Sequence, residues 1–302
     1  MNVLSKPRSL LQYKLDMEQH RLVLKAKEVK PRNYFRVSEL GGCDRQIVLD
    51  MMGSQPRPST PKDEMKGDVG RLFHEWAVGF FAQDYQLEGV EGRFTDEAWE
   101  ALPGLPAQRQ DDGSIHAGVG PYEVHFRPDF IVVGLNEGPR WPVEEWVLVD
   151  TKSTTSGYGV SQAMKEAPSY GAKGMWGWWP VYVNQVQMYL HLLGLKEAAI
   201  LQIGREHGEL LMDRFEPRQK IAGPGGRYIE VPEWQWQRIP YDPKVVEGAF
   251  AQMERVTRHL KDGTIPEPGC PGTGWIYNRC LHNAAEVAGC KSAAQCHGGR
   301  GR

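Results

Sequence analysis

The sequence predicts an α/β fold, and three stretches of the chain carry that prediction. Residues 130–133 and 146–152 are short apolar runs with many β-branched side chains, bounded by Gly, Pro and Asn, as is typical of β-strands. Residues 181–194 form a longer, mostly apolar stretch that closes with Gly194, and glycine is the usual residue just past the end of a helix. An apolar fraction of 40% is enough for a substantial core.

The composition excludes several classes of protein. A formal net charge of −2 excludes a globally basic nucleic-acid-binding protein, so any contact with nucleic acid must come from local patches. Charged residues interrupt every apolar run near Met1, which argues against a secretory signal, and no apolar run is long enough to span a bilayer. We therefore expect a soluble, cytoplasmic protein with no membrane partner.

The first 50 residues are expected to contain short helices. Residues 1–34 carry many charges around scattered leucines, which predicts an N-terminal helical extension (residues 1–35) that packs on the main body or contacts a partner or DNA backbone. After Ser38 and a glycine pair, a second helix is expected to begin near Asp44. Cys43 would lie at the entrance of that helix, where backbone N–H groups favour a thiolate; a buried, inert cysteine is the alternative.

Residues 54–66 are rich in Pro, Ser and Lys and are expected to form a loop, whereas residues 67–83 have the apolar pattern of a helix. Gly70 and His74 lie one turn apart on that helix. A glycine within a helix costs about 1 kcal/mol relative to alanine, so its presence suggests that another group approaches the backbone there. His74 is interpreted either as a packed core residue or as a metal ligand.

Residues 84–126 contain clusters of Gly, Pro and Asp, and most of them are expected to be irregular. Residues 115–126 are the exception, because they look like a strand or an antiparallel meander that leads into the next segment.

The predicted strands at 130–133 and 146–152 suggest a metal site. Asp150 and Lys152 are two residues apart on a strand, so their side chains point to the same face, and a hairpin would bring Asp129 close to them. Hard divalent cations prefer oxygen ligands, and a nearby lysine stabilises negative charge that develops on a phosphate. The alternative is a half-exposed hairpin with a surface salt bridge.

Two features follow the second strand. Residues 153–180 form a long connection in which aromatic and basic side chains alternate, a combination suited to stacking of unpaired bases; the alternative is that the tryptophans fill the core. The lysines and tryptophans concerned are Lys165, Lys173, Trp176 and Trp178. On the helix at 181–194, Gln185 and Tyr189 are four residues apart and form a polar stripe that would orient a phosphate, a water or a metal-bound carboxylate.

The rest of the chain is expected to add a buried strand, its hairpin partner, a Trp-bearing strand and a long amphipathic helix, at residues 198–203, 209–215, 224–238 and 241–261. Four of the five cysteines then lie between residues 270 and 296. In a reducing compartment this clustering favours metal or iron–sulfur ligation over disulfides.

Together these motifs resemble the PD-(D/E)XK nucleases of the RecB-like kind, and in particular the CRISPR-adaptation and phage exonucleases that carry an iron–sulfur cluster. The resemblance covers residues 36–296. Near Cys43 the chain departs from the family pattern, because it has Asp44 where proline is usual. Its motifs occur in the family's order: Gly70 to His74, Pro128-Asp129, Asp150-Thr151-Lys152, and Gln185 with Tyr189.

The resemblance implies a restriction-endonuclease-like fold, with a mixed central β-sheet flanked by helices. The nuclease core would span residues 36–265, and a Cys-rich segment, residues 266–302, would pack back near Cys43. A cytoplasmic location is implied, in the host cytoplasm for a phage-encoded protein.

The resemblance also implies roles for the site residues. His74, Asp129, Asp150 and the Thr151 carbonyl would hold one or two Mg²⁺ or Mn²⁺ ions. Lys152 would position or activate the attacking water or stabilise the transition state, and Gln185 and Tyr189 would orient Lys152 or the DNA strand. The residues expected to contact DNA are Arg71, Lys165, Lys173, Trp176 and Trp178.

The cysteine ligands are implied by the same resemblance. The family pattern is one N-terminal cysteine and three late cysteines spaced Cys-x₂-Cys-x₅-Cys; Cys290 and Cys296 keep the x₅ spacing, but this chain has Val287 where the first late cysteine is expected. The preferred set for a [4Fe–4S] cluster is Cys43, Cys280, Cys290 and Cys296, with Cys270 as the alternative to Cys280. A zinc site built from the four late cysteines with His282, and unligated thiols, are the competing interpretations.

The predicted function is therefore a metal-dependent DNA exonuclease that acts on linear ends or single strands in recombination, repair or phage DNA processing. A recombination or CRISPR-adaptation protein is the expected partner besides DNA. The alternatives are a catalytically silent DNA-binding or adaptor subunit and a structure-specific endonuclease of the same fold.

Overall fold

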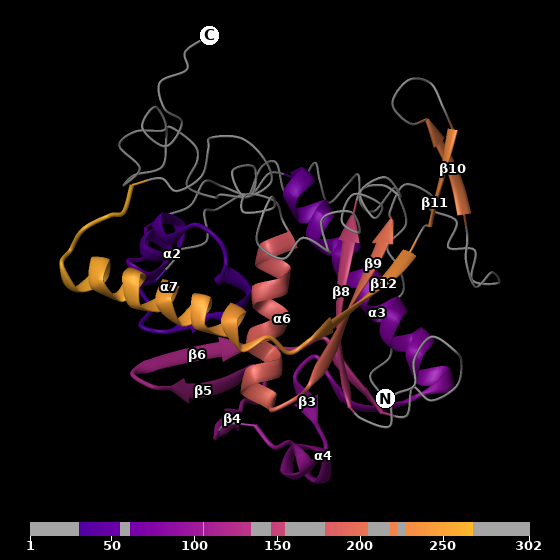
Figure 1. Cartoon of the computed structure of the whole chain (residues 1–302), viewed down its shortest axis with the longest axis horizontal. Helices are drawn as coiled ribbons and strands as arrows, with labels where there is room; N and C mark the ends of the chain where they lie inside the picture. Colours follow the sequence, from indigo (N-terminus) through magenta and orange to yellow (C-terminus); the bar gives the residue numbers. More distant parts are fainter. Residues whose placement is uncertain are drawn as a thin grey trace.

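A computed structural model of the chain describes residues 30–54, 61–104, 106–133, 146–154, 179–204, 218–222, 228–232 and 234–267 (Figure 1). These residues form a mixed α/β fold with a six-stranded sheet, a four-stranded sheet and a separate two-stranded hairpin. The expected mixed sheet flanked by helices is confirmed. None of the helices in the described part of the chain is long and apolar enough to cross a membrane.

The six-stranded sheet has the strand order β12-β9-β8-β7-β2-β3. Its strands are β2 (Gln86–Val90), β3 (Arg93–Phe94), β7 (Phe130–Val133), β8 (Val147–Thr154), β9 (Glu197–Gly204) and β12 (Trp234–Pro240). The predicted hairpin is present, because β7 pairs with β8 in antiparallel register with Phe130 opposite Val149. The β8–β9 pair is parallel and the other pairs are antiparallel, which makes the sheet mixed.

Both faces of this sheet are covered by helices, and side-chain alternation divides the core accordingly. Phe130 and Val132 pack with Ala77 and Phe81 of α3 (Pro61–Asp84). Ile131 and Leu148, from the same two strands, belong to the larger core cluster on the opposite face, which includes α6 (Trp179–Leu193). Figure 1 shows α6 on one side of the strands and α3 on the other. Strands covered on both faces are apolar throughout, which explains why their patterns were recognisable.

The four-stranded sheet has the order β1-β6-β5-β4. Its strands are β1 (Phe35–Arg36), β4 (Ala107–Arg109), β5 (Ile115–Val119) and β6 (Tyr122–Phe126). Ile115, Ala117, Val124 and Phe126 face the core, whereas the residues between them on both strands point outward. The sheet therefore has one apolar face and one polar face, as antiparallel sheets commonly do.

The remaining described elements connect these layers. They are the 3₁₀ turn η1 (Val37–Glu39), α2 (Asp44–Met51), α4 (Asp96–Ala101), the β10 (Arg218–Ala222) and β11 (Tyr228–Pro232) hairpin, and α7 (Pro243–Lys261). The helices predicted near Asp44, at 181–194 and at 241–261 are confirmed.

A single glutamine of α7 holds the turn that precedes α2. Gln252 Oε1 accepts a hydrogen bond from the Gly41 N–H at 2.7 Å, and Gln252 Nε2 donates to the Gly42 carbonyl at 3.0 Å. Gly41 has a φ of +83°, and a Cβ at this position would lie 2.7 Å from Asn184 Nδ2 of α6. The turn therefore requires glycine, for both conformation and space.

Two expectations about the first half of the chain were wrong. Residues 61–66 were expected in a loop, but α3 begins at Pro61. Proline is tolerated in the first turn of a helix because the N–H group that it lacks would have no hydrogen-bond partner within the helix there. Residues 84–126 were expected to be mostly irregular, yet they contain β2, β3, α4 and β4, whose short strands are set by pairing rather than by local pattern. The meander at 115–126 is confirmed as the β5–β6 hairpin. The N-terminal helix over residues 1–29, the 209–215 strand and the Cys-bearing segment from 268 onward lie outside the described residues.

Candidate active site

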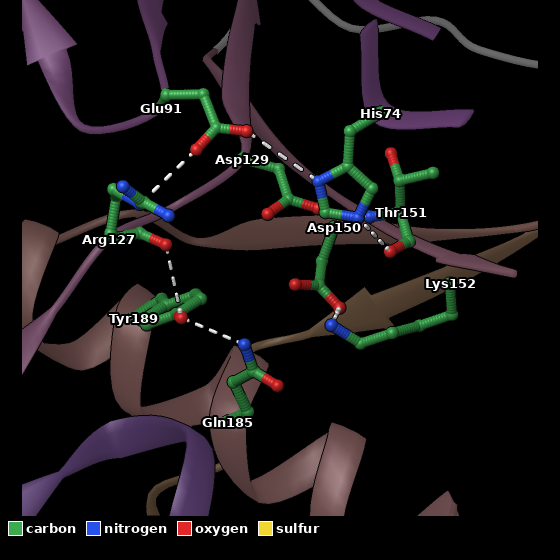
Figure 2. Close-up of polar contacts among 9 residues, drawn as sticks. All are labelled: His74, Glu91, Arg127, Asp129, Asp150, Thr151, Lys152, Gln185 and Tyr189. Carbon is green, nitrogen blue, oxygen red and sulfur yellow. Dashed lines mark hydrogen bonds and ion pairs between the residues drawn. The ribbon is translucent and has the colours of Figure 1, made fainter. Parts of the chain in front are cut away.

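Four of the predicted site residues come together where the start of β7 meets the middle of β8 (Figure 2). Asp129 immediately precedes β7, and Asp150, Thr151 and Lys152 lie on β8. The hairpin register carries Asp129 to the backbone of its partner strand, where Asp129 Oδ2 accepts a hydrogen bond from the Thr151 N–H at 2.7 Å. The juxtaposition that the hairpin predicted is therefore present.

His74 reaches the same place from α3. Its Nε2 lies 3.0 Å from the Thr151 carbonyl oxygen and 3.6 Å from Asp129 Oδ2. Its Nδ1 lies 3.6 Å from Glu91 Oε1. Burial works to lower the pKa of His74, but Glu91 and Asp129 outweigh it and raise that pKa above its ordinary value. His74 is thus not a packed apolar-core histidine, because its ring is surrounded by oxygen atoms.

Asp129 and Asp150 are both buried carboxylates. Burial and the nearby Asp150 charge raise the pKa of Asp129 to about 6. Asp150 is completely buried, and among the described residues neither of its oxygens has a hydrogen bond of good geometry, although Lys152 Nζ lies 2.7 Å from Oδ2. Buried carboxylate oxygens without donors are costly. These residues therefore fit a divalent cation, which would supply the missing positive charge.

Lys152 is held as a cation. Its ammonium lies 2.7 Å from Asp150 Oδ2 and 4.8 Å from the centre of the Tyr182 ring of α6. Burial alone would lower the pKa of Lys152, but attraction to Asp150 and Asp129 outweighs it and raises the pKa above its ordinary value. Its side chain is 13% exposed, so the charge is largely shielded from solvent. This environment favours a charge-stabilising role over that of a proton acceptor.

Gln185 and Tyr189 form the polar stripe that their spacing predicted. Gln185 Nε2 donates to the Tyr189 hydroxyl at 2.8 Å, and that hydroxyl donates to the Arg127 carbonyl at 3.3 Å. Burial raises the pKa of Tyr189, so its hydroxyl stays protonated. These contacts anchor the backbone two residues before Asp129, whereas the contacts of Lys152 are with Asp150 and Tyr182. An orienting role toward Lys152 or DNA stays a prediction.

Glu91 and Arg127 belong to the same network and were not predicted. Glu91 Oε2 lies 3.2 Å from Arg127 Nε, while its other oxygen faces His74, as Figure 2 shows. The Glu91 N–H also donates to the Asp129 carbonyl at 2.6 Å. Glu91 has a φ of 50°, a conformation uncommon for a residue other than glycine and often associated with functional sites. Its sequence signal was only an acidic residue before Gly92 in a turn.

Within the described part of the chain, the hydrogen bonds and ion pairs that define this network do not include Arg71 or Cys43. Arg71 is exposed on α3, one turn before His74. Cys43 is buried directly before α2. The remaining predicted residues, which lie outside the described part of the chain, are Lys165, Lys173, Trp176, Trp178, Cys270, Cys280, His282, Cys290 and Cys296.

A second cluster of potential metal ligands lies elsewhere. Within the described ranges, one group of three His, Cys, Asp or Glu side chains has ligand atoms that all lie within 4.8 Å of one another: His116, Glu123 and His125. The ligand atoms of His74, Asp129 and Asp150 are not so tightly grouped, because Asp150 turns toward Lys152 and α6 while His74 comes from α3. The His116 cluster was not predicted from the sequence.

The chain matches no protein-family model and no curated protein. Among solved structures it is similar to the protein SSO0001, with 14% identity, a TM-score of 0.35, and coverage of 80% of this chain and 84% of that one. An alkaline exonuclease from Laribacter hongkongensis gives 9% identity, a TM-score of 0.37, and coverage of 80% and 92%. A phage-related exonuclease from Haemophilus somnus 129PT gives 13% identity, a TM-score of 0.31, and coverage of 76% and 94%. At these identities and scores the likenesses assign neither a family nor an activity to this chain.

Proposed function

We propose that this protein is a metal-dependent deoxyribonuclease that digests linear or single-stranded DNA as an exonuclease. The observation that carries the proposal is the pair of buried carboxylates, Asp129 and Asp150, beside a largely buried lysine cation, where the start of β7 pairs with the middle of β8. A fold has no structural reason to bury two carboxylates with so few donors unless a cation joins them. The motif order of the PD-(D/E)XK nucleases supports the same activity.

The residues that would hold one or two Mg²⁺ or Mn²⁺ ions are Asp129, Asp150, His74 and the Thr151 carbonyl. Their donor set of carboxylate, carbonyl and imidazole suits these ions, and a histidine among oxygen ligands favours Mn²⁺. A divalent ion bound there would lower the pKa of a bound water molecule and neutralise charge on the scissile phosphate.

Lys152 would bind the phosphate charge that develops during hydrolysis. Its ammonium is fixed by Asp150 on one side and by the Tyr182 ring on the other, so little reorganisation is needed when substrate arrives. Its raised pKa keeps it protonated at neutral pH, and we therefore assign it to charge stabilisation rather than to activation of water as a base.

Glu91 would orient the His74 ring. With Nδ1 of His74 facing the Glu91 carboxylate, the Nε2 edge faces the Thr151 carbonyl and Asp129. A carboxylate behind a ligating histidine fixes its ring orientation and increases its basicity. Arg127 holds Glu91 in turn, at 3.2 Å.

We also propose that Cys43 joins the late cysteines in a [4Fe–4S] cluster, with zinc as the alternative. Arg45, two residues after Cys43, donates to the Pro266 carbonyl at 2.8 Å, which brings the start of the Cys-bearing segment beside α2. A cluster would colour the purified protein brown, with absorbance near ~400 nm, whereas a zinc protein would be colourless.

Digestion of 5′- and 3′-labelled linear DNA with Mn²⁺ and with Mg²⁺ tests the nuclease proposal. Asp150→Asn should lower the rate at least about 100-fold while DNA binding in a gel shift is retained. Asp262→Asn, an exposed aspartate at the end of α7, is the matched control and should digest DNA at the wild-type rate. Undiminished digestion by Asp150→Asn would refute the assignment.

The same assay separates the competing functions. An exonuclease releases nucleotides or short oligomers from linear DNA and leaves closed circles intact. A structure-specific endonuclease would produce discrete fragments from circular DNA. A silent adaptor would shift DNA in the gel but cut none of it with either metal.

A further inference from the structure

The outer face of the β5–β6 hairpin gathers metal-binding side chains that the proposed nuclease chemistry does not use. His116 and His125 are direct partners across the two antiparallel strands, and Glu123 lies two residues before His125, on the same face. Their neighbours Ala117 and Val124 point the other way, into the core. The register of the hairpin therefore brings two imidazoles and a carboxylate to one spot.

The distances within this group are short enough for a single ion. One ligand atom from each of the three side chains lies within 4.8 Å of the other two. His125 Nε2 lies 2.6 Å from Glu123 Oε1, and the rings of His116 and His125 are stacked with their centres 3.4 Å apart. Two histidines and one carboxylate, with a position left for water, are a ligand set that zinc commonly takes in proteins.

A short hydrogen-bond chain determines which ring nitrogen of a neutral His116 can bind a metal. Ser114 Oγ donates to Asp112 Oδ1 at 2.7 Å and lies 3.3 Å from His116 Nε2. Because the serine proton goes to Asp112, Nε2 of His116 is the donor to Ser114, which leaves Nδ1 with its lone pair.

Neighbouring positive charge is partly compensated. Arg36 is the cross-strand partner of His125 on β1, but its guanidinium lies 3.5 Å from Glu39 Oε1. Arg32, which affects His125 electrostatically, is also paired with Glu39. Glu39 therefore balances one of these two positive charges, and the ligand Glu123 adds a negative charge at the hairpin itself.

From this arrangement we infer that His116, Glu123 and His125 form a second metal site, for Zn²⁺ or a similar first-row dication. In a neutral His125 ring the Nε2 proton points to Glu123, so binding through Nε2 requires that proton to pass to solvent while Nδ1 takes up another, with no net release. The ring planes, now 7° apart, tilt so that both lone pairs converge, since a lone pair of imidazole lies in its ring plane. His116 is the ring that turns, because Tyr34 stacks on His125 with ring centres 3.6 Å apart and holds it.

The bound ion would cross-link β5 and β6. Strand β6 continues through Arg127 and Pro128 into Asp129, so the ion would stiffen the strand that leads into the candidate active site. The inference does not depend on the nuclease proposal, because none of the three ligands contacts His74, Asp129, Asp150 or Lys152 in any described interaction.

Calorimetric titration of the chelator-treated full-length protein with Zn²⁺ tests the site. The wild type should bind one equivalent more than the double variant His116→Ala/His125→Ala, since the cysteines and the candidate active site are the same in both. His259→Ala, a change at a histidine of α7 that contacts Thr264, is the matched control and should leave the number of bound Zn²⁺ equivalents unchanged.

Two further measurements keep the result interpretable. With Co²⁺, the double variant should lose visible absorption bands but retain any near-ultraviolet thiolate bands from the cysteines. Glu123→Gln, a change on an exposed side chain that leaves the hairpin intact, should weaken Zn²⁺ binding at least about 10-fold. Equal numbers of equivalents in the wild type and the folded double variant, or unchanged affinity in Glu123→Gln, would overturn the inference.

Discussion

The two groups of potential metal ligands differ in how deeply the fold buries their charged side chains. Asp129 and Asp150 lie in a sheet covered by helices on both faces, with Asp150 completely buried. His116, Glu123 and His125 lie on the polar face of the smaller sheet, and Glu123 is exposed. In the buried group, burial and the Asp150 charge raise the pKa of Asp129 to about 6, whereas the outer group follows from strand register. The depth of a charge, more than the identity of its residues, determines how strongly the fold depends on it.

Removal of one side chain from each group should give the largest contrast. Lys152→Ala leaves the buried Asp150 without its cation and should lower the free energy of unfolding by about 3–5 kcal/mol in metal-free buffer at pH 8. His125→Ala should lower it by only about 1 kcal/mol, because it leaves no buried charge unpaired and its partner Glu123 is exposed. Urea unfolding of both variants measures the difference. Similar losses in the two variants would contradict the distinction between the groups.

Asp129→Asn should stabilise the metal-free protein above pH 6. The pKa of Asp129 rises from 3.8 in the unfolded chain to about 6 in the folded protein, a difference of roughly 3 kcal/mol at most. The folded protein thus binds the proton of the Asp129 carboxyl more tightly than the unfolded chain does. The stability that this proton contributes is complete below pH 3.8 and is lost as the pH rises through about 6.

Thermal unfolding in the presence of a chelator, between pH 4 and pH 8, measures this effect. The variant should melt above the wild type at pH 8, and the gap should close toward pH 4. Glu123→Gln is the matched removal of an exposed carboxylate and should follow the wild type across the range. A constant gap at every pH would show that the carboxylate is not the cause.

Glu91→Gln should act on metal affinity more than on stability. The variant loses the negative charge behind His74 and in front of Arg127, so Mn²⁺ affinity at the candidate active site should fall about 10- to 100-fold. Zn²⁺ affinity at the hairpin should not change. Titration with each ion distinguishes the two sites, and an equal loss for both ions would indicate a general disturbance of the fold.

Tyr189→Phe should have a smaller effect than the changes at Lys152 and Asp129. The variant keeps the ring but removes the hydroxyl that joins Gln185 to the Arg127 carbonyl, which should cost about 1–2 kcal/mol of stability. On the proposal that Tyr189 positions the backbone before Asp129, kcat should fall with little change in KM. Gln187→Ala provides a comparison, since the Gln187 side chain forms hydrogen bonds with the backbone of Pro240 and Asp242, between β12 and α7, rather than with the candidate site.

The parts of the site that the sequence revealed are those fixed by local pattern. The strands around Asp129 and Asp150 are apolar and short, and α6 has a continuous apolar stretch with a glycine after it, so each could be assigned without its neighbours. Gly194 adopts a φ of +69°, as a glycine in that position should.

The parts that the sequence did not reveal depend on pairing between distant segments. Glu91 reaches the site because β2 pairs with β7 with a register shift between Leu87 and Gly89, and no local signal specifies that shift. His116 and His125 meet because the chain reverses between β5 and β6. The sequence pattern at 115–126 allowed either one strand or a meander, so it did not predict which residues lie opposite each other. Pro61 looked like a loop residue because its neighbours are polar, although helices accept proline in the first turn.

The Gln252 side chain has a further consequence for how the chain tolerates oxidation. It bonds both glycines of the turn before α2, and Arg255, one turn later on α7, holds Asp44 at 2.8 Å. Early and late segments of the chain are thereby joined by amide and guanidinium groups, and α2 and α7 also share the larger apolar core. Under the proposal of a cysteine-bound cluster, treatment with air or a chelator should leave α2 docked on α7, so loss of the cluster's colour would not mean loss of the folded core.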